Sequence, residues 1–241
     1  MKRSERLSSV ASLALVAFVG ACSSTPPVPP APPEESVKPG INDSFLAEDM
    51  AVDDYVARFE VESREVYLER HALAATLNLR RGEAVADIGA GTGLFLEPFA
   101  EAVGPAGKVY AVDIAPKFIE HLGERAAEAG YAHVQPHLCS EDSVDLPRAS
   151  VDIAFICDTY HHFEYPRSTM TSLRDALRPG GEVVLVDFER IPGVTREWLM
   201  NHVRAGKDVV TAEVLSFGFE LIEEVEVDGL VENYVLRFRK R

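Results

Sequence analysis

Basic residues are scarce in this chain. Lysine and arginine number 24 against 39 aspartates and glutamates in 241 residues, which gives a formal net charge of −15 at neutral pH. An acidic surface of this kind repels the phosphate backbone of a nucleic acid. We therefore expect neither DNA nor RNA as a substrate or partner.

Long apolar runs and cysteines are also few. The apolar stretch 10–20 is about a dozen residues long, too short to span a bilayer as a mature helix. It follows a net basic start, an order typical of a secretory signal. Cys139 and Cys157 fall on different predicted strands and are interpreted as separate buried thiols. Export would place both in an oxidising space, and the sequence leaves open whether they pair.

The end of the apolar stretch resembles the cleavage site of bacterial lipoproteins. Residues 19–22 read Val-Gly-Ala-Cys, and the resemblance implies that residues 1–21 are a signal peptide and that Cys22 is lipidated. Ser23, which is not an aspartate, implies sorting to the outer membrane. We expect an exported lipoprotein on the periplasmic side, held to the membrane by its N-terminal lipid. An ordinary signal peptide or an uncleaved anchor is the alternative.

The segment that follows is rich in proline. Residues 23–40 contain seven prolines, a density that favours an extended chain without a core of its own. We interpret residues 22–40 as the lipidated cysteine and a semi-rigid linker, and residues 41–241 as one folded domain.

A glycine-rich turn follows the first predicted strand of this domain. Residues 85–93 read Val-Ala-Asp-Ile-Gly-Ala-Gly-Thr-Gly, and a helix is predicted to begin directly after them. Glycine permits a positive φ and lets a ligand lie against bare backbone. The start of a helix adds unpaired N–H groups and a partial positive charge. The stretch predicts a nucleotide-type site, and a packed turn without a ligand is the alternative.

The glycine spacing excludes two common nucleotide motifs. The dinucleotide fingerprint G-x-G-x-x-G needs a glycine where Leu94 lies, and no Lys-Ser/Thr pair completes a phosphate-binding loop. The pattern Asp-x-Gly-x-Gly-x-Gly over 87–93 instead resembles motif I of the class I S-adenosylmethionine (SAM)-dependent methyltransferases.

Two further features support this resemblance. The second predicted strand, 108–113, ends in Asp113, about twenty residues beyond the glycines, where a carboxylate can accept hydrogen bonds from both ribose hydroxyls. Capping of the next helix is the alternative role for Asp113. Before the fifth predicted strand, residues 177–181 read Leu-Arg-Pro-Gly-Gly, which is also similar to methyltransferases of this class.

The resemblance covers about residues 60–241 and implies a fold. That fold is α/β and Rossmann-like: a seven-stranded, mostly parallel sheet with an antiparallel last strand and helices on both faces. Apolar residues near helical spacing predict a long first helix over 63–77. Two late helices are predicted over 196–204 and 208–216, and a terminal hairpin turns at Asp228-Gly229.

The resemblance also implies SAM as the cofactor and a set of residues around it. Asp142 is the candidate for the adenine amino group, with Glu141 as the second choice and a solvated acidic loop as the alternative. The remaining candidates are Asp87, Gly89, Ala90, Gly91 and Gly93 around the amino-acid end of SAM, and Asp113 with its neighbour Ile114 at the ribose.

The fourth predicted strand ends in Asp-Thr-Tyr-His-His-Phe over 158–163. This is the motif IV position, which in the resembled family faces both the methyl donor and the acceptor. Asp158, His161 and His162 are the candidates for a base. Adjacent histidines are expected to point in different directions, so at most one should face the pocket. No metal site is expected, because the histidines considered (His133, His137, His161 and His162) show no ligand spacing on a single element.

These observations predict a SAM-dependent methyltransferase. The chain has no Asn/Asp-Pro-Pro-Tyr run, a motif of methyltransferases that act on amino groups of nucleic acids or of glutamine. Because the chain is also acidic, we expect a small-molecule acceptor. The alternative is an exported, non-catalytic module that keeps the fold and binds a nucleoside or metabolite, since SAM is made in the cytosol. A third possibility is that the apparent signal is not used.

Overall fold

The computed structural model describes residues 34–241. The predicted signal peptide, Cys22 and most of the proline-rich linker lie outside the described residues. Within the described part of the chain, we find no helix with both the length and the apolar character needed to cross a membrane.

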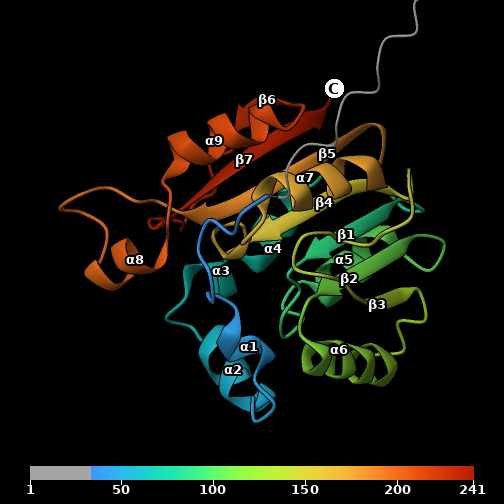
Figure 1. Ribbon diagram of the computed structural model, residues 1–241. Helices are drawn as coiled ribbons and strands as arrows, with labels where there is room; N and C mark the ends of the chain where they lie inside the picture. The colour runs from blue at the N-terminus through green and yellow to red at the C-terminus, as the bar shows by residue number, and fades with distance from the viewer. Residues whose placement is uncertain (1–33) are drawn as a thin grey trace, which may run out of the picture. The chain divides into compact units, whose positions relative to one another are not determined.

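A seven-stranded sheet forms the centre of the described domain (Figure 1). Across the sheet the strands run in the order β3-β2-β1-β4-β5-β7-β6. Neighbours from β3 to β5 are parallel, whereas β7 is antiparallel to both β5 and β6. The predicted sheet is thereby confirmed. The strands are β1 (Ala84–Ile88), β2 (Lys108–Asp113), β3 (Val134–Leu138), β4 (Val151–Cys157), β5 (Leu177–Phe188), β6 (Phe219–Glu224) and β7 (Asn233–Lys240).

Helices cover both faces of the sheet, as predicted. They are α4 (Arg70–Thr76), α5 (Leu96–Val103), α6 (Pro116–Glu128), α7 (Pro166–Ala176) and α9 (Lys207–Ser216). Alternating side chains of β1 belong to two apolar layers: Ala86 and Ile88 pack with α7 and α9, and Val85 packs with α4, α5 and α6. All five residues of β1 are therefore buried, as in other parallel strands covered on both faces.

The prediction of one long helix over 63–77 is wrong, because this segment forms two short helices. These are α3 (Glu65–Leu68) and α4, and the backbone of Glu69 between them has φ −92° and ψ 13°. The two helices have different partners. The Glu65 carboxylate accepts hydrogen bonds from the backbone N–H groups of residues 231–233, whereas Leu73 is fully buried against the sheet.

The N-terminal part of the domain packs beside α6 (Figure 1). It contains α1 (Asp43–Leu46) and α2 (Val52–Phe59), and the ring of Tyr55 lies 5.5 Å from that of Phe118. The preceding residues also contact the domain. Glu164 accepts hydrogen bonds from the backbone N–H of Val37 and of Gly40, both at 2.9 Å. These contacts begin before residue 41, within the predicted linker.

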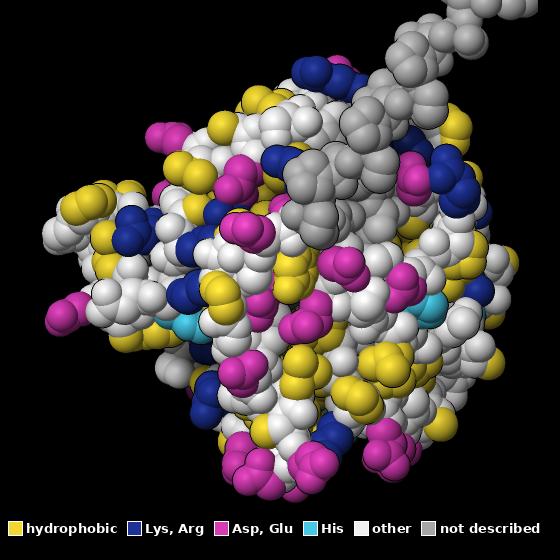
Figure 2. Space-filling model, viewed as in Figure 1, with side chains coloured by type: hydrophobic (Ala, Val, Ile, Leu, Met, Phe, Trp, Pro, Cys, Tyr) yellow, Lys and Arg dark blue, Asp and Glu magenta, His cyan; other side chains and the backbone are white. Residues whose placement is uncertain are grey.

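The C-terminal part agrees with its predicted elements. Helix α8 (Glu197–His202) and α9 lie in the two predicted helical segments, and β6 and β7 form the hairpin. Gly229 in its turn has φ 95°, a left-handed conformation that favours glycine. On the face shown in Figure 2, acidic side chains are spread widely between the basic ones, as the net charge predicts.

Candidate active site

A cavity of about 670 Å³ opens at the carboxyl edge of the sheet. Its lining includes the residues that follow β1, β2 and β4, which is where open α/β sheets bind their ligands. Residues from α1 to α3 and from α8 complete the wall, and Phe45, Phe188 and Trp198 give it aromatic surface.

The glycine turn after β1 needs glycine for steric reasons. Gly89 has φ 74°, and a Cβ placed on it would lie 2.3 Å from Cγ2 of Thr159. Gly93 has φ 84°, and its Cβ would lie 2.8 Å from a methyl group of Leu122. Gly91 has φ 52°, and a Cβ placed on it would meet no atom closer than 3.9 Å. Of the three, Gly91 therefore leaves the most room for a ligand.

Six of the eight predicted cofactor residues line the cavity: Asp87, Gly89, Ala90, Gly91, Asp113 and Ile114. Gly93 does not line it, because its α-carbon packs on Leu122 beneath the turn. Asp142 is exposed and is not a lining residue, whereas its neighbour Glu141 is. The geometry therefore favours the second choice, Glu141, for a contact from this loop.

Two buried carboxylates, Asp87 and Asp113, lie together beneath the glycine turn. Burial, and then the charge of Asp113, raise the pKa of Asp87 to about 7. Burial raises the pKa of Asp113 to about 6, against the lowering effect of its backbone hydrogen bonds. Its two oxygens accept hydrogen bonds from Gly91 N and Ala115 N, each at 2.9 Å. The site therefore holds negative charge at a high desolvation cost.

Asp158, a predicted base, is occupied by two partners. The Arg64 guanidinium forms an ion pair with one carboxylate oxygen, and Nδ2 of Asn233 donates to the other at 2.6 Å. Burial raises the pKa of Asp158 to about 6, and the charge of Arg64 acts in the opposite direction. The residue has φ 49°. Asp158 thus ties α3 and β7 to the end of β4.

His161 forms a buried pair with Asp187 at the end of β5. Its Nδ1 lies 2.7 Å from Oδ1 of Asp187, and both side chains are at most 3% exposed. The Asp187 carboxylate also accepts the backbone N–H of His161 and of Phe188. These bonds fix the imidazole with Nδ1 toward the carboxylate, which leaves Nε2 for a ligand in the cavity that His161 lines.

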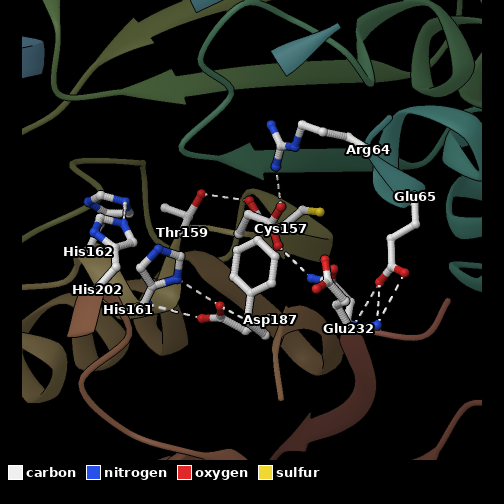
Figure 3. Close-up of polar contacts among 12 residues, drawn as sticks. Arg64, Glu65, Cys157, Thr159, His161, His162, Asp187, His202 and Glu232 are labelled. Atoms are coloured by element: carbon white, nitrogen blue, oxygen red, sulfur yellow. Dashed lines mark hydrogen bonds and ion pairs between the residues drawn. The ribbon is translucent and has the colours of Figure 1, made fainter. Parts of the chain in front are cut away.

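His162 also lines the cavity, so the expectation that only one of the two histidines would face it is wrong. Residues 160–162 form a 3-10 helix rather than a continuation of the strand, and the rings of His161 and His162 lie 4.4 Å apart. His202, from α8, joins them (Figure 3). Burial, and then the charges of neighbouring histidines, lower the pKa of His162 to about 2 and that of His202 to about 4.

Comparison with known proteins agrees with this geometry. Residues 86–183 match the family model of the methyltransferase domain. The ubiquinone/menaquinone biosynthesis C-methyltransferase UbiE of Burkholderia mallei is 30% identical over 118 residues, 48% of each chain. The chain thus spans about half the length of the curated relatives it matches.

Solved structures resemble most of the described domain. A SAM-dependent methyltransferase from Aquifex aeolicus has a TM-score of 0.68 at 22% identity, over 77% of this chain and 97% of that one. The [4+2]-cyclase SpnF has a TM-score of 0.63 at 15% identity, over 71% and 80%. The fold is that of a class I SAM-dependent methyltransferase. This methyltransferase fold, with the matched domain, implies SAM as the cofactor.

Sequence reasoning missed three residues at or beside the cavity. Asp187 ends β5 at the same edge as Asp113, a position that could have identified it. His202 and Arg64 gave no such signal. His202 lies in α8 and Arg64 directly before α3, both far from motif IV in the chain, and only the folded structure brings them to it. The two cysteines, Cys139 and Cys157, are separate free thiols, as interpreted from the sequence, but both are only partly buried.

Proposed function

We propose that this protein transfers a methyl group from SAM to a small-molecule acceptor. One observation supports this most strongly: a single cavity is lined both by the glycine turn with its two carboxylates and by His161, whose Nδ1 is paired with the buried Asp187. The first suits a nucleoside cofactor with a cationic amino-acid end. The second suits removal of a proton from an acceptor.

The cofactor half of the proposal rests on Asp87 and Asp113. Each oxygen of Asp113 accepts one backbone N–H, and a carboxylate oxygen has capacity for a second hydrogen bond. Both ribose hydroxyls can therefore donate to Asp113. Asp87 lies one strand away, and its charge offsets that of the SAM ammonium group. Glu141 is the candidate for the adenine amino group.

The acceptor half rests on His161. A hydroxyl, thiol or amine of the acceptor would give its proton to Nε2 of His161, and its lone pair would attack the methyl carbon in line with the departing sulfur. The carbon–sulfur bond breaks, and the sulfonium becomes the neutral thioether of S-adenosylhomocysteine. The main contribution of the protein is alignment of donor and acceptor with exclusion of water.

The cavity indicates the size of the acceptor. Its volume of about 670 Å³ lies within the usual range of about 300–1,000 Å³ for small-molecule sites. SAM would occupy part of that volume. The remainder, beside Phe45, Phe188 and Trp198, suits a small acceptor with apolar or aromatic surface.

Binding of SAM is the first test. Calorimetry on the full-length protein should show SAM and S-adenosylhomocysteine binding in the micromolar range. Asp113→Ala should abolish binding, because it removes the proposed acceptor of both ribose hydrogen bonds. Asp208→Ala, an exposed acid on α9, is the matched control and should bind normally. Absence of SAM binding by the wild-type protein would refute the proposal.

Turnover separates the enzyme from the alternative. SpnF shows that a cyclase can have this fold, and a non-catalytic binding module remains the second candidate because of the export-type N-terminus. Labelled SAM incubated with a small-molecule extract should yield labelled product. His161→Asn should slow transfer by about 10²–10⁴-fold with an unchanged Kd for SAM. SAM binding without any transfer would favour the binding module.

We also propose that the chain is an exported lipoprotein anchored through Cys22. The support is the basic start, the short apolar stretch and the cysteine that follows small residues. Metabolic labelling with a lipid precursor should mark the wild-type protein and not Cys22→Ser. Equal labelling of both, or recovery of the wild type in the cytosolic fraction, would contradict this localisation.

A further inference from the structure

Three histidines gather on the acceptor side of the cavity. His161 and His162 come from the 3-10 helix after β4, and His202 from the last turn of α8 (Figure 3). One ring nitrogen of each lies within 4.8 Å of the other two. The three residues belong to two separate elements, and His162 and His202 are 40 residues apart in the chain.

The spacing of this triad already approaches that of a metal site. Nε2 of His162 lies 3.3 Å from Nε2 of His202. In a tetrahedral zinc site with Zn–N bonds of about 2.0–2.1 Å, two ligand nitrogens are about 3.3–3.4 Å apart. This pair therefore has the nitrogen–nitrogen spacing of two zinc ligands. The His161 nitrogen lies at most 4.8 Å from theirs, so it would approach by up to about 1.5 Å to complete the set.

Asp187 provides the outer partner that metal-bound histidines usually have. It accepts a hydrogen bond from Nδ1 of His161 at 2.7 Å while it is held by two backbone N–H groups. Such a carboxylate fixes the tautomer and makes the opposite ring nitrogen a better ligand. The Nε2 of His161 is the nitrogen left for the metal.

All three histidines line the cavity, so a fourth position would face it. Three protein ligands with one open position are typical of catalytic zinc sites, and a set of three imidazoles suits zinc among the divalent ions. We propose that His161, His162 and His202 bind a zinc ion whose open position points toward the acceptor.

The role of this site rests on the proposed methyl transfer. An acceptor hydroxyl or thiol that takes the fourth position would lose its proton more readily, because zinc lowers the pKa of an oxygen or sulfur bound to it. The proton passes to solvent, and the metal-bound anion attacks the methyl group of SAM. His161 would then act on the acceptor as a zinc ligand rather than as a free base.

Zinc binding by the full-length protein tests the inference. Metal-free wild-type protein should take up one Zn²⁺ per chain that His202→Ala does not, measured by elemental analysis after dialysis. Competition with a zinc indicator measures the affinity for Zn²⁺. Relative to wild type, Asp187→Asn should lose about 10–100-fold in this affinity, and His202→Ala should lose more. His71→Ala, an exposed histidine on α4, is the matched control and should bind like wild type.

Two readouts keep this test independent of activity and of the cysteines. Co²⁺ in place of Zn²⁺ should give the visible absorption of a tetrahedral site in wild type and in His71→Ala, and not in His202→Ala. SAM affinity, measured on the same samples, should be equal in all variants. Equal zinc uptake by wild type and His202→Ala would overturn the metal site while leaving the proposed function intact. Failure to bind SAM would instead refute the proposed function.

Discussion

Asp87 is expected to lower the free energy of unfolding of the ligand-free protein. The variant Asp87→Asn measures the size of this effect. Folding raises the pKa of this carboxyl from 3.8 to about 7, mainly through burial and then through the charge of Asp113. One pKa unit corresponds to about 1.4 kcal/mol. Ionised Asp87 therefore costs the folded state about 4 kcal/mol at pH 8.

The sign of the effect follows from linkage. The pKa of Asp87 is higher in the folded state than in the unfolded state. Between pH 3.8 and about 7, the folded state therefore keeps a proton on Asp87 that the unfolded state has already lost. Stability is lost as the pH rises through this window. The cost of Asp87 is about 1.5 kcal/mol at pH 5 and reaches about 4 kcal/mol above pH 7. Asparagine has a similar volume and no charge, so it lacks this dependence.

Urea unfolding without ligand at pH 5 and pH 8 provides the measurement. The stability of Asp87→Asn relative to wild type should increase by about 2.5 kcal/mol between the two pH values. Any pH-independent effect of the amide cancels in this difference. Asp208→Asn, exposed on α9, is the control and should show no such increase. A relative stability of Asp87→Asn that stays constant or falls with pH would refute the reasoning.

Two further predictions concern the surroundings of the site. Gly89→Ala should destabilise the protein by about 1–2 kcal/mol through its left-handed backbone and by about 1–3 kcal/mol through the clash with Thr159. Adding Thr159→Ala should recover only the clash in thermal unfolding, and full additivity would contradict this. Arg64→Ala leaves Asp158 without its cation and should cost about 1–3 kcal/mol. The exposed Arg148–Asp175 pair is the control. Arg148→Ala should lower the free energy of unfolding by less than about 1 kcal/mol. Equal losses in the two variants would show that the Arg64–Asp158 pair contributes no more than a surface contact.

Local requirements of the backbone made most of the fold predictable. The glycines that follow the apolar run of β1 can be recognised in the sequence. Their backbone has a positive φ, and any side chain there would collide with Thr159 or Leu122, so only glycine fits. Asp113 was found for a related reason: in a parallel sheet, the carboxyl ends of neighbouring strands meet at one edge. The helix break at Glu69 was not predicted, because the contacts that distinguish α3 from α4 join Glu65 to residues 231–233, far away in the chain.

By itself, the sequence determined the strands and the glycine turn, because each depends on residue type at short range, and the family resemblance implied the assembly of the strands into a mostly parallel sheet. Only the tertiary structure decided the side of the cavity that we propose for the acceptor. It placed His202 against His162 and Asp187 against His161, and it turned both motif IV histidines toward the cavity through a 3-10 helix. Such contacts depend on the strand order and on the paths of the connecting segments. No local pattern encodes them, so side chains far apart in the chain meet only once the sheet has formed.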